Sequence, residues 1–103
     1  MDIEQIRADV AGKKKALRIT THAQIEAAKD GLLLADLKNV FDHGRVIEQY
    51  PADKRALLYA KTEAGQLPVH VVVETDEDEV VIVTAYIPDP AMWIGNVRRR
   101  RQG

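Results

Sequence analysis

The chain has 103 residues, which is enough for one domain but not for two. It contains no cysteine, and this excludes both disulfides and thiolate metal ligands. The net charge of −1 conceals an uneven distribution, because residues 1–18 and 98–101 hold nine of the fifteen Lys and Arg. Residues 19–97 hold six cations against thirteen anions. Basic ends around an acidic middle are compatible with polyanion binding and equally with two solvated termini.

The sequence shows no segment with the length of a membrane span. The longest apolar runs, such as Val80–Val83, are far too short to cross a bilayer. Residues 1–4 are acidic and lack the basic-then-apolar layout of a signal peptide. The missing cysteines also fit a reducing compartment. We therefore expect a cytoplasmic protein that does not contact membranes.

The first predicted element is a helix within residues 1–17. Asp2, with Gln5 three residues later, has the pattern of a capping box. Apolar residues then recur at helical spacing, namely Ile3, Ile6, Val10 and Leu17. Gly12 and the lysines after it weaken this pattern, so the helix could end early or fray.

Two further helices are predicted before residue 45. Thr21 and Gln24 have the N-cap and N3 pattern of a second helix, which Gly31 ends. A third helix is predicted from about Leu33 to His43, with Gly44 as its stop. Its apolar face consists of Leu34, Leu37, Val40 and Phe41.

From residue 45 onward the pattern becomes extended. Four strands are predicted, namely Arg45–Tyr50, Arg55–Glu63, Pro68–Glu74 and Glu79–Ile87. The short connections between them make neighbouring strands antiparallel. The predicted fold class is therefore α+β, with two to three N-terminal helices packed on a four-stranded antiparallel sheet. We expect a single domain over residues 1–103, made of an N-terminal helix (1–17), a core (18–90) and a basic tail (91–103).

Four segments in a particular order resemble a known family. They are Ile19–Ala23, Gly44–Pro51, Leu67–Val72 and Ile82–Pro90, and Trp93 follows shortly after. Together they resemble the family called domain of unknown function 4258, over about residues 18–101. The resemblance implies a bacterial protein encoded near toxin–antitoxin genes. It also implies a fold similar to the barnase–RelE group of metal-independent ribonucleases.

The same resemblance implies site residues. His22, His70, Thr84 and Tyr86 match the polar positions of the family, and on that analogy they are the candidate catalytic residues. Many members carry arginines in the second helix where this chain has Glu26 and Asp30. If those arginines bind phosphate, this chain has lost two of them.

Chemical reasoning about these residues leaves alternatives open. His22 lies in the first turn of the second helix, where free N–H groups attract phosphate and the dipole disfavours a protonated imidazole. A neutral imidazole can act as a general base, but a lone histidine is more often structural. Alternation places His70 on the face opposite Val69 and Val71. There it could act as a general acid or base, or it could be an interior histidine whose hydrogen bonds are satisfied. Whether it shares a face with Thr84 and Tyr86 depends on the strand register.

A metal site competes with this interpretation. His22, Glu26 and Asp30 recur every four residues and so lie on one side of the second helix, with His70 as a fourth candidate ligand. A solvated acidic stripe explains the same spacing better, so we predict neither a metal nor any other cofactor.

The predicted tail ends in four consecutive arginines. Arg98, Arg99, Arg100 and Arg101 could each bind phosphate in a forked geometry, with Trp93 as the anchor of the segment. A solvated terminus is the alternative.

Three functions follow from these observations. The first is a small metal-independent ribonuclease, toxin-like, that cleaves RNA by attack of the 2′-hydroxyl. The second is a non-catalytic module of a toxin–antitoxin-like system that binds RNA or a protein. The third is a metal-dependent hydrolase. The expected partners are RNA and an antitoxin or other protein, and the oligomeric state is left open.

Overall fold

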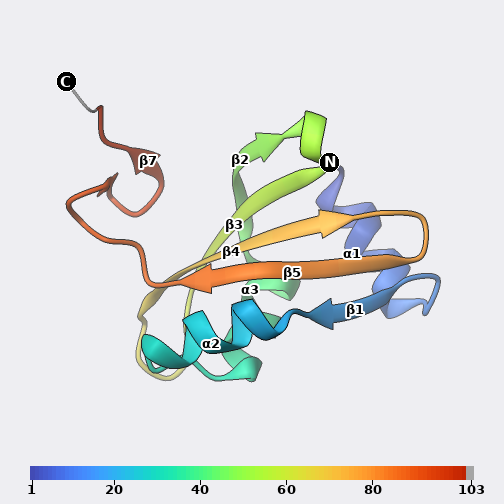
Figure 1. Cartoon of the computed structure of the whole chain (residues 1–103), viewed down its shortest axis with the longest axis horizontal. Helices are drawn as coiled ribbons and strands as arrows, with labels where there is room; N and C mark the ends of the chain where they lie inside the picture. Colours follow the sequence, from blue (N-terminus) through green and yellow to red (C-terminus); the bar gives the residue numbers. More distant parts are fainter. Residues whose placement is uncertain (102–103) are drawn as a thin grey trace.

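The computed structural model describes residues 1–101, so residues 102 and 103 of the predicted basic tail lie outside the described part (Figure 1). Helix α1 spans Ile3–Ala11, and the carboxylate of Asp2 caps it by accepting the N–H of Gln5 at 3.2 Å. The helix ends at Gly12 and not at residue 17. Lys13 has a left-handed φ of 60°, which turns the chain into a strand, β1, at Ala16–Ile19. The predicted continuation of the helix to Leu17 is therefore wrong.

Helices α2 and α3 follow as predicted, with one shift. Helix α2 spans Thr21–Lys29, but its N-cap is Thr20, whose hydroxyl accepts the N–H of Ala23 at 3.0 Å. Gly31, with a φ of 75°, ends it. Helix α3 spans Leu34–His43 and ends at Gly44. Its buried residues are Leu37, Val40 and Phe41, whereas Leu34, predicted on the same face, is exposed at the start of the helix.

Five strands form one mixed sheet with the order β1-β5-β4-β3-β2, which runs from the bottom to the top of Figure 1. The last four strands of the chain's main sheet are β2 (Arg45–Tyr50), β3 (Arg55–Lys61), β4 (Pro68–Thr75) and β5 (Glu79–Tyr86). They are antiparallel, as predicted, and a 3₁₀ turn at Pro51–Asp53 joins β2 to β3. The prediction missed β1, which pairs with β5 in parallel.

Alternation along the central strands separates an inner from an outer face. Val69, Val71 and Val73 of β4 point inward and are fully buried. They belong to one core cluster with residues of all three helices, including Ile6, Ala23, Ala27, Leu37, Val40 and Phe41. The helices therefore cover the inner face, and the polar residues between the valines of β4 lie on the outer face.

The predicted basic tail contains two short strands. After β5 the chain forms a small antiparallel hairpin, β6 (Trp93–Ile94) and β7 (Arg98–Arg99), beyond the end of β5 (Figure 1). Its turn uses positive φ at Gly95 (58°) and Asn96 (67°), a geometry that glycine and asparagine tolerate. Residues of this hairpin contact the outer face of the sheet. Among residues 1–101, no helix is both long and apolar enough to cross a membrane.

Candidate functional site

A bulge in β5 docks the start of α2 against the sheet. Val72 pairs with Thr84 and Val73 pairs with Ile82, so Val83 is an extra residue in β5. The hydroxyl of Thr20, the N-cap of α2, donates to the carbonyl of Val83 at 3.3 Å. This contact holds the first turn of α2, and with it His22, beside the bulge.

The bulge and the start of α2 form one wall of an open hollow of about 440 Å³ on the outer face. The hollow is built from α2, the 3₁₀ turn and strands β2 to β5. Its lining residues are His22, Tyr50, Asp53, Arg55, Val72, Val83 and Thr84. It therefore brings together two of the four predicted catalytic residues, His22 and Thr84, although they are far apart in the sequence.

The other two predicted residues meet nearby on the same face. His70 pairs across the sheet with both Tyr59 and Tyr86, and because Thr84 pairs with Val72 it shares this face. The register thus settles the open question of whether His70, Thr84 and Tyr86 point to the same side. His70 and Tyr86, however, do not line the hollow.

His70 is fully buried, and both of its ring nitrogens have partners. Nε2 lies 2.5 Å from the carbonyl oxygen of Asn96, which can only accept, so Nε2 carries a proton. In the neutral ring, Nδ1 then accepts from the Tyr86 hydroxyl at 3.3 Å. Burial lowers the pKa of His70 and raises the pKa of Tyr86, and both shifts favour this neutral arrangement.

The hairpin covers this histidine with its tryptophan. The ring of Trp93, itself only 4% exposed, packs edge-on against His70 with centroids 4.4 Å apart. Tyr59 and Tyr86 pack against the same imidazole at 5.9 and 5.3 Å. Four rings thus join β3, β4 and β5 to the C-terminal hairpin, and no solvent-exposed part of His70 remains.

Arg99 links the hairpin to the hollow through two residues of β2. Its Nε donates to the two carboxylate oxygens of Glu48 at 3.0 and 3.2 Å, and its Nη2 donates to the Tyr50 hydroxyl at 3.3 Å. Its guanidinium carbon also lies 4.7 Å from the centroid of Trp93. These hydrogen bonds to Tyr50 and Glu48 raise the pKa of Arg99. Burial raises the pKa of Tyr50, which also donates its hydroxyl proton to Glu48.

Sequence reasoning missed Glu48, Tyr50 and Arg55. Glu48 and Tyr50 are two residues apart on β2, a spacing that places them on one face. That spacing was a usable signal, and Tyr50 pairs directly with Arg55 across the turn that joins β2 to β3. A bulge between Val46 and Glu48 shifts the pairing only for the start of β2. What the spacing did not show is that Arg99 of the hairpin binds both Glu48 and Tyr50.

The predicted phosphate-binding arginines gather around a second open hollow, of about 680 Å³. It is lined by Ile94, Arg98, Arg99, Arg100 and Arg101. Arg99 is paired with Glu48, and Nε of Arg100 donates to the carbonyl of Pro90 at 2.8 Å. The remaining two guanidinium groups, Arg98 and Arg101, are exposed.

The alternative metal site is not assembled. Within residues 1–101, no three His, Asp or Glu side chains lie close enough together to hold an ion. Glu26 pairs with Lys29 at 3.1 Å, and the carboxylate of Asp30 accepts the N–H of Ile87 at 2.9 Å. Asp30 therefore ties the end of α2 to the end of β5, which is a structural contact.

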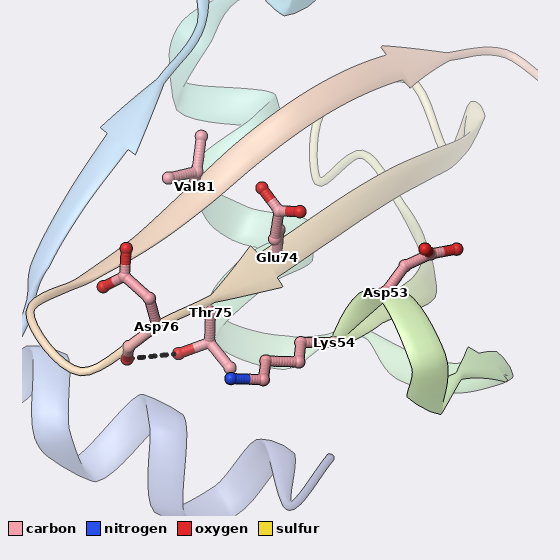
Figure 2. Close-up of a pocket in the computed structure, with 6 residues that line it drawn as sticks. All are labelled: Asp53, Lys54, Glu74, Thr75, Asp76 and Val81. Carbon is pink, nitrogen blue, oxygen red and sulfur yellow. Dashed lines mark hydrogen bonds between the residues drawn. The ribbon is translucent and has the colours of Figure 1, made fainter.

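A further polar hollow, of about 280 Å³, lies at the far end of β4 (Figure 2). The carboxylate of Asp76 accepts the N–H groups of Asp78 and Glu79, each at 2.8 Å, and these bonds lower its pKa. The Thr75 hydroxyl accepts from Lys15 Nζ at 3.0 Å. Because these polar groups stabilise the β4–β5 turn, we regard this hollow as structural.

The arrangement as a whole is an α+β fold in which helices cover one face of a sheet and polar residues gather on the other. A crystal structure with the same fold is that of the Brucella abortus ribonuclease toxin BrnT, at 18% identity and a TM-score of 0.51. The likeness covers 72% of this chain and 99% of that chain. A search of curated proteins gives no significant match.

The family model described as domain of unknown function (DUF4258) matches residues 19–87, and the chain belongs to this family. The resemblance inferred from the sequence is thereby confirmed. The matched residues include α2, α3 and strands β2 to β5 in full. They include His22, His70, Thr84 and Tyr86, and they end before the hairpin.

Proposed function

We propose that this protein is a toxin-like ribonuclease that cleaves RNA without a metal ion. The observation that carries the proposal is the outer-face hollow, in which His22 and Thr84 lie with Arg55 and Tyr50. A base, a hydroxyl, a guanidinium and a phenol in one open hollow are the groups that phosphodiester cleavage needs. The fold shared with a ribonuclease toxin supports the same class of activity.

In the proposed reaction His22 is the general base. Its exposed imidazole takes the proton of a ribose 2′-hydroxyl, and the freed oxygen attacks the adjacent phosphorus. The bond from phosphorus to the 5′-oxygen then breaks, leaving a 2′,3′-cyclic phosphate and a 5′-hydroxyl end. Among the first N–H groups of α2, that of Ala23 is already bonded to the Thr20 hydroxyl, so those of Thr21 and His22 favour a phosphate at this position.

Arg55 and Tyr50 supply the remaining functions. Arg55 pairs with Glu74 at 3.3 Å, and both side chains are partly exposed, so the guanidinium can turn to a phosphate in the hollow. Its charge then stabilises the negative charge that develops on the phosphorane. Tyr50 keeps its proton because its pKa is raised, and it can donate to the leaving 5′-oxygen once its hydroxyl turns away from Glu48, to which it donates in this structure. Thr84 contributes a hydroxyl that can bond a phosphate oxygen. Under the closed hairpin, His70 and Tyr86 instead bond each other.

The test is cleavage of mixed RNA by the purified protein in excess EDTA. Wild type is compared with His22→Ala and with His43→Ala, which removes another exposed histidine, outside the hollow. Loss of a general base lowers the rate by about 100-fold or more, so His22→Ala should be almost inactive while His43→Ala cleaves like wild type. Full activity in His22→Ala would overturn the assignment of the base.

A second candidate is a module that binds RNA or a protein without catalysis, and one observation favours it. His70 and Tyr86, two of the family's polar positions, are used to hold the hairpin on the sheet. If wild type leaves RNA intact in EDTA but retains a labelled single strand in a binding assay, this second function replaces the first. A protein partner of the antitoxin kind stays a prediction of both.

A further inference from the structure

The C-terminal hairpin lies outside the part of the chain that the family model matches. The family model ends at residue 87, and β6 and β7 lie at Trp93–Ile94 and Arg98–Arg99. The hairpin contributes no residue to the main sheet or to the lining of the outer-face hollow.

The hairpin covers an imidazole and a carboxylate, two groups that can accept or donate a proton. Trp93 and the Asn96 carbonyl bury His70, and Arg99 occupies the carboxylate of Glu48. Glu48 lies beside Tyr50, which lines the outer-face hollow. A shift of the hairpin away from the sheet would thus free an imidazole and a carboxylate next to the hollow.

Three contacts hold the hairpin on the sheet: the packing of Trp93 on His70, the hydrogen bond from His70 to the Asn96 carbonyl, and the Arg99–Glu48 ion pair. The ion pair is the one of the three that solvent reaches. The side chains of Arg99 and Glu48 are 53% and 22% exposed, so solvent and salt screen their attraction. The two strands of the hairpin have only two residues each. Such a segment opens at a lower free energy than the central strands do.

The charge around this contact indicates what could release it. Arg98, Arg100 and Arg101 surround Arg99 at the arginine-lined hollow, so a chain of phosphates would be attracted to this place. A phosphate accepts the same forked hydrogen bonds from a guanidinium as a carboxylate does. A phosphate at Arg99 therefore competes directly with Glu48.

We propose that the β6–β7 hairpin is a strap over the outer face, closed by the Arg99–Glu48 ion pair, and that an RNA strand opens it by taking Arg99 from Glu48. Opening joins Glu48, His70 and Tyr86 to the outer-face hollow. This proposal depends on the proposed function in one respect only, namely that the strand is RNA.

The first experiment measures strap opening without any ligand, by amide hydrogen exchange. The amides of Trp93, Val97 and Arg100 are bonded within the segment, to the carbonyls of Asp89, Ile94 and Met92, and they report on opening. In Arg99→Ala their protection should fall about 5-fold relative to wild type, the effect of one surface ion pair, while the amides of β4 and β5 keep theirs. Arg98→Ala is the matched control, because it removes the same charge from the same strand, and the side chain of Arg98 makes no hydrogen bond or ion pair within residues 1–101. Equal protection in the two variants would overturn the strap.

Glu48→Gln keeps the test decisive if Arg99→Ala fails to fold. It weakens the same ion pair from the side of β2, and it should lower the protection of the same three amides. An unchanged exchange pattern in a folded Glu48→Gln protein would equally contradict the proposal.

The second experiment adds single-stranded DNA, whose phosphates resemble those of RNA but which has no 2′-hydroxyl to attack. Binding is followed by the anisotropy of a labelled strand, and exchange is measured on the saturated complex. We expect hairpin protection to fall in wild type, since the strand favours the open state. Increased protection, or no binding, would overturn release by a phosphate chain. DNA is not cleaved by this mechanism, so the two proposals can fail separately. If the strap opens but the protein does not cleave RNA, only the proposed function is refuted. If the protein cleaves RNA but the strap stays closed, only the strap is refuted.

Discussion

Replacing His70 by alanine separates a structural from a purely catalytic role for this residue. His70 has no exposed surface, and three aromatic rings pack against its edges and face at centroid distances of 4.4 to 5.9 Å. The substitution deletes the whole ring from this cluster. It also leaves the carbonyl of Asn96 without its donor and the hydroxyl of Tyr86 without its acceptor.

The magnitude follows from these losses. Removing a large buried side chain costs about 2 to 4 kcal/mol through lost contacts and an unfilled cavity, and each unpaired polar group adds up to about 1 kcal/mol. Rotation of the Tyr86 hydroxyl and entry of water recover part of this, so we expect a loss of about 3 kcal/mol. For a domain of this size, that corresponds to a fall in Tm of about 15 °C.

The measurement is thermal unfolding followed by circular dichroism, with His43→Ala as the matched control. His43 is exposed at the end of α3, so its removal should change the free energy of unfolding by less than about 0.5 kcal/mol. If His70→Ala and His43→Ala have the same Tm, the ring cluster does not stabilise the fold and the reasoning is wrong.

Two further outcomes are expected. Burial lowers the pKa of His70 below the unfolded value of 6.5, so the unfolded state binds the proton more readily than the folded state. The free energy of unfolding should therefore fall as the pH drops through 6.5 and below it. Urea unfolding at several pH values should show this decline in His43→Ala but not in His70→Ala. Gly44→Ala should destabilise by about 2 kcal/mol, because a Cβ there would lie 2.5 Å from the carbonyl oxygen of Val40. Gly65→Ala, whose nearest neighbour would be 3.5 Å away, should change the stability by less than about 0.5 kcal/mol, and equal losses in the two glycine variants would contradict this steric argument.

The helices and the antiparallel strands were predictable because their signals are local. Asp2 begins α1 by capping the N–H of Gln5, and Gly31 ends α2 through its left-handed φ. The valines of β4 likewise alternate with His70 along a single strand. Strand β1 was missed because Ala16–Ile19 is short and lies directly after a helical pattern. It becomes a strand only because the edge of β5 is available to pair with it.

The candidate site was predictable only in part. The resemblance to the family pointed to His22, His70, Thr84 and Tyr86, and the sheet register places the three strand residues among them on one face. The division of these four residues between an open hollow and a covered cluster depends on the bulge at Val83 and on the hairpin. Tyr50 and Arg55 meet across the short turn between β2 and β3. Glu48, in contrast, is brought to the site's edge by Arg99, a contact that no local spacing encodes.

The sequence by itself determined the α+β class and the family, since periodicity, capping residues and motif order are properties of neighbouring residues. Only the tertiary structure decided the fifth strand and which polar residues meet. Arg99 was expected to bind phosphate as part of a tail, yet it pairs with Glu48, fifty-one residues away. Long-range pairing of this kind depends on how the hairpin and the sheet fold onto each other. A run of four arginines carries no information about which carboxylate it will meet.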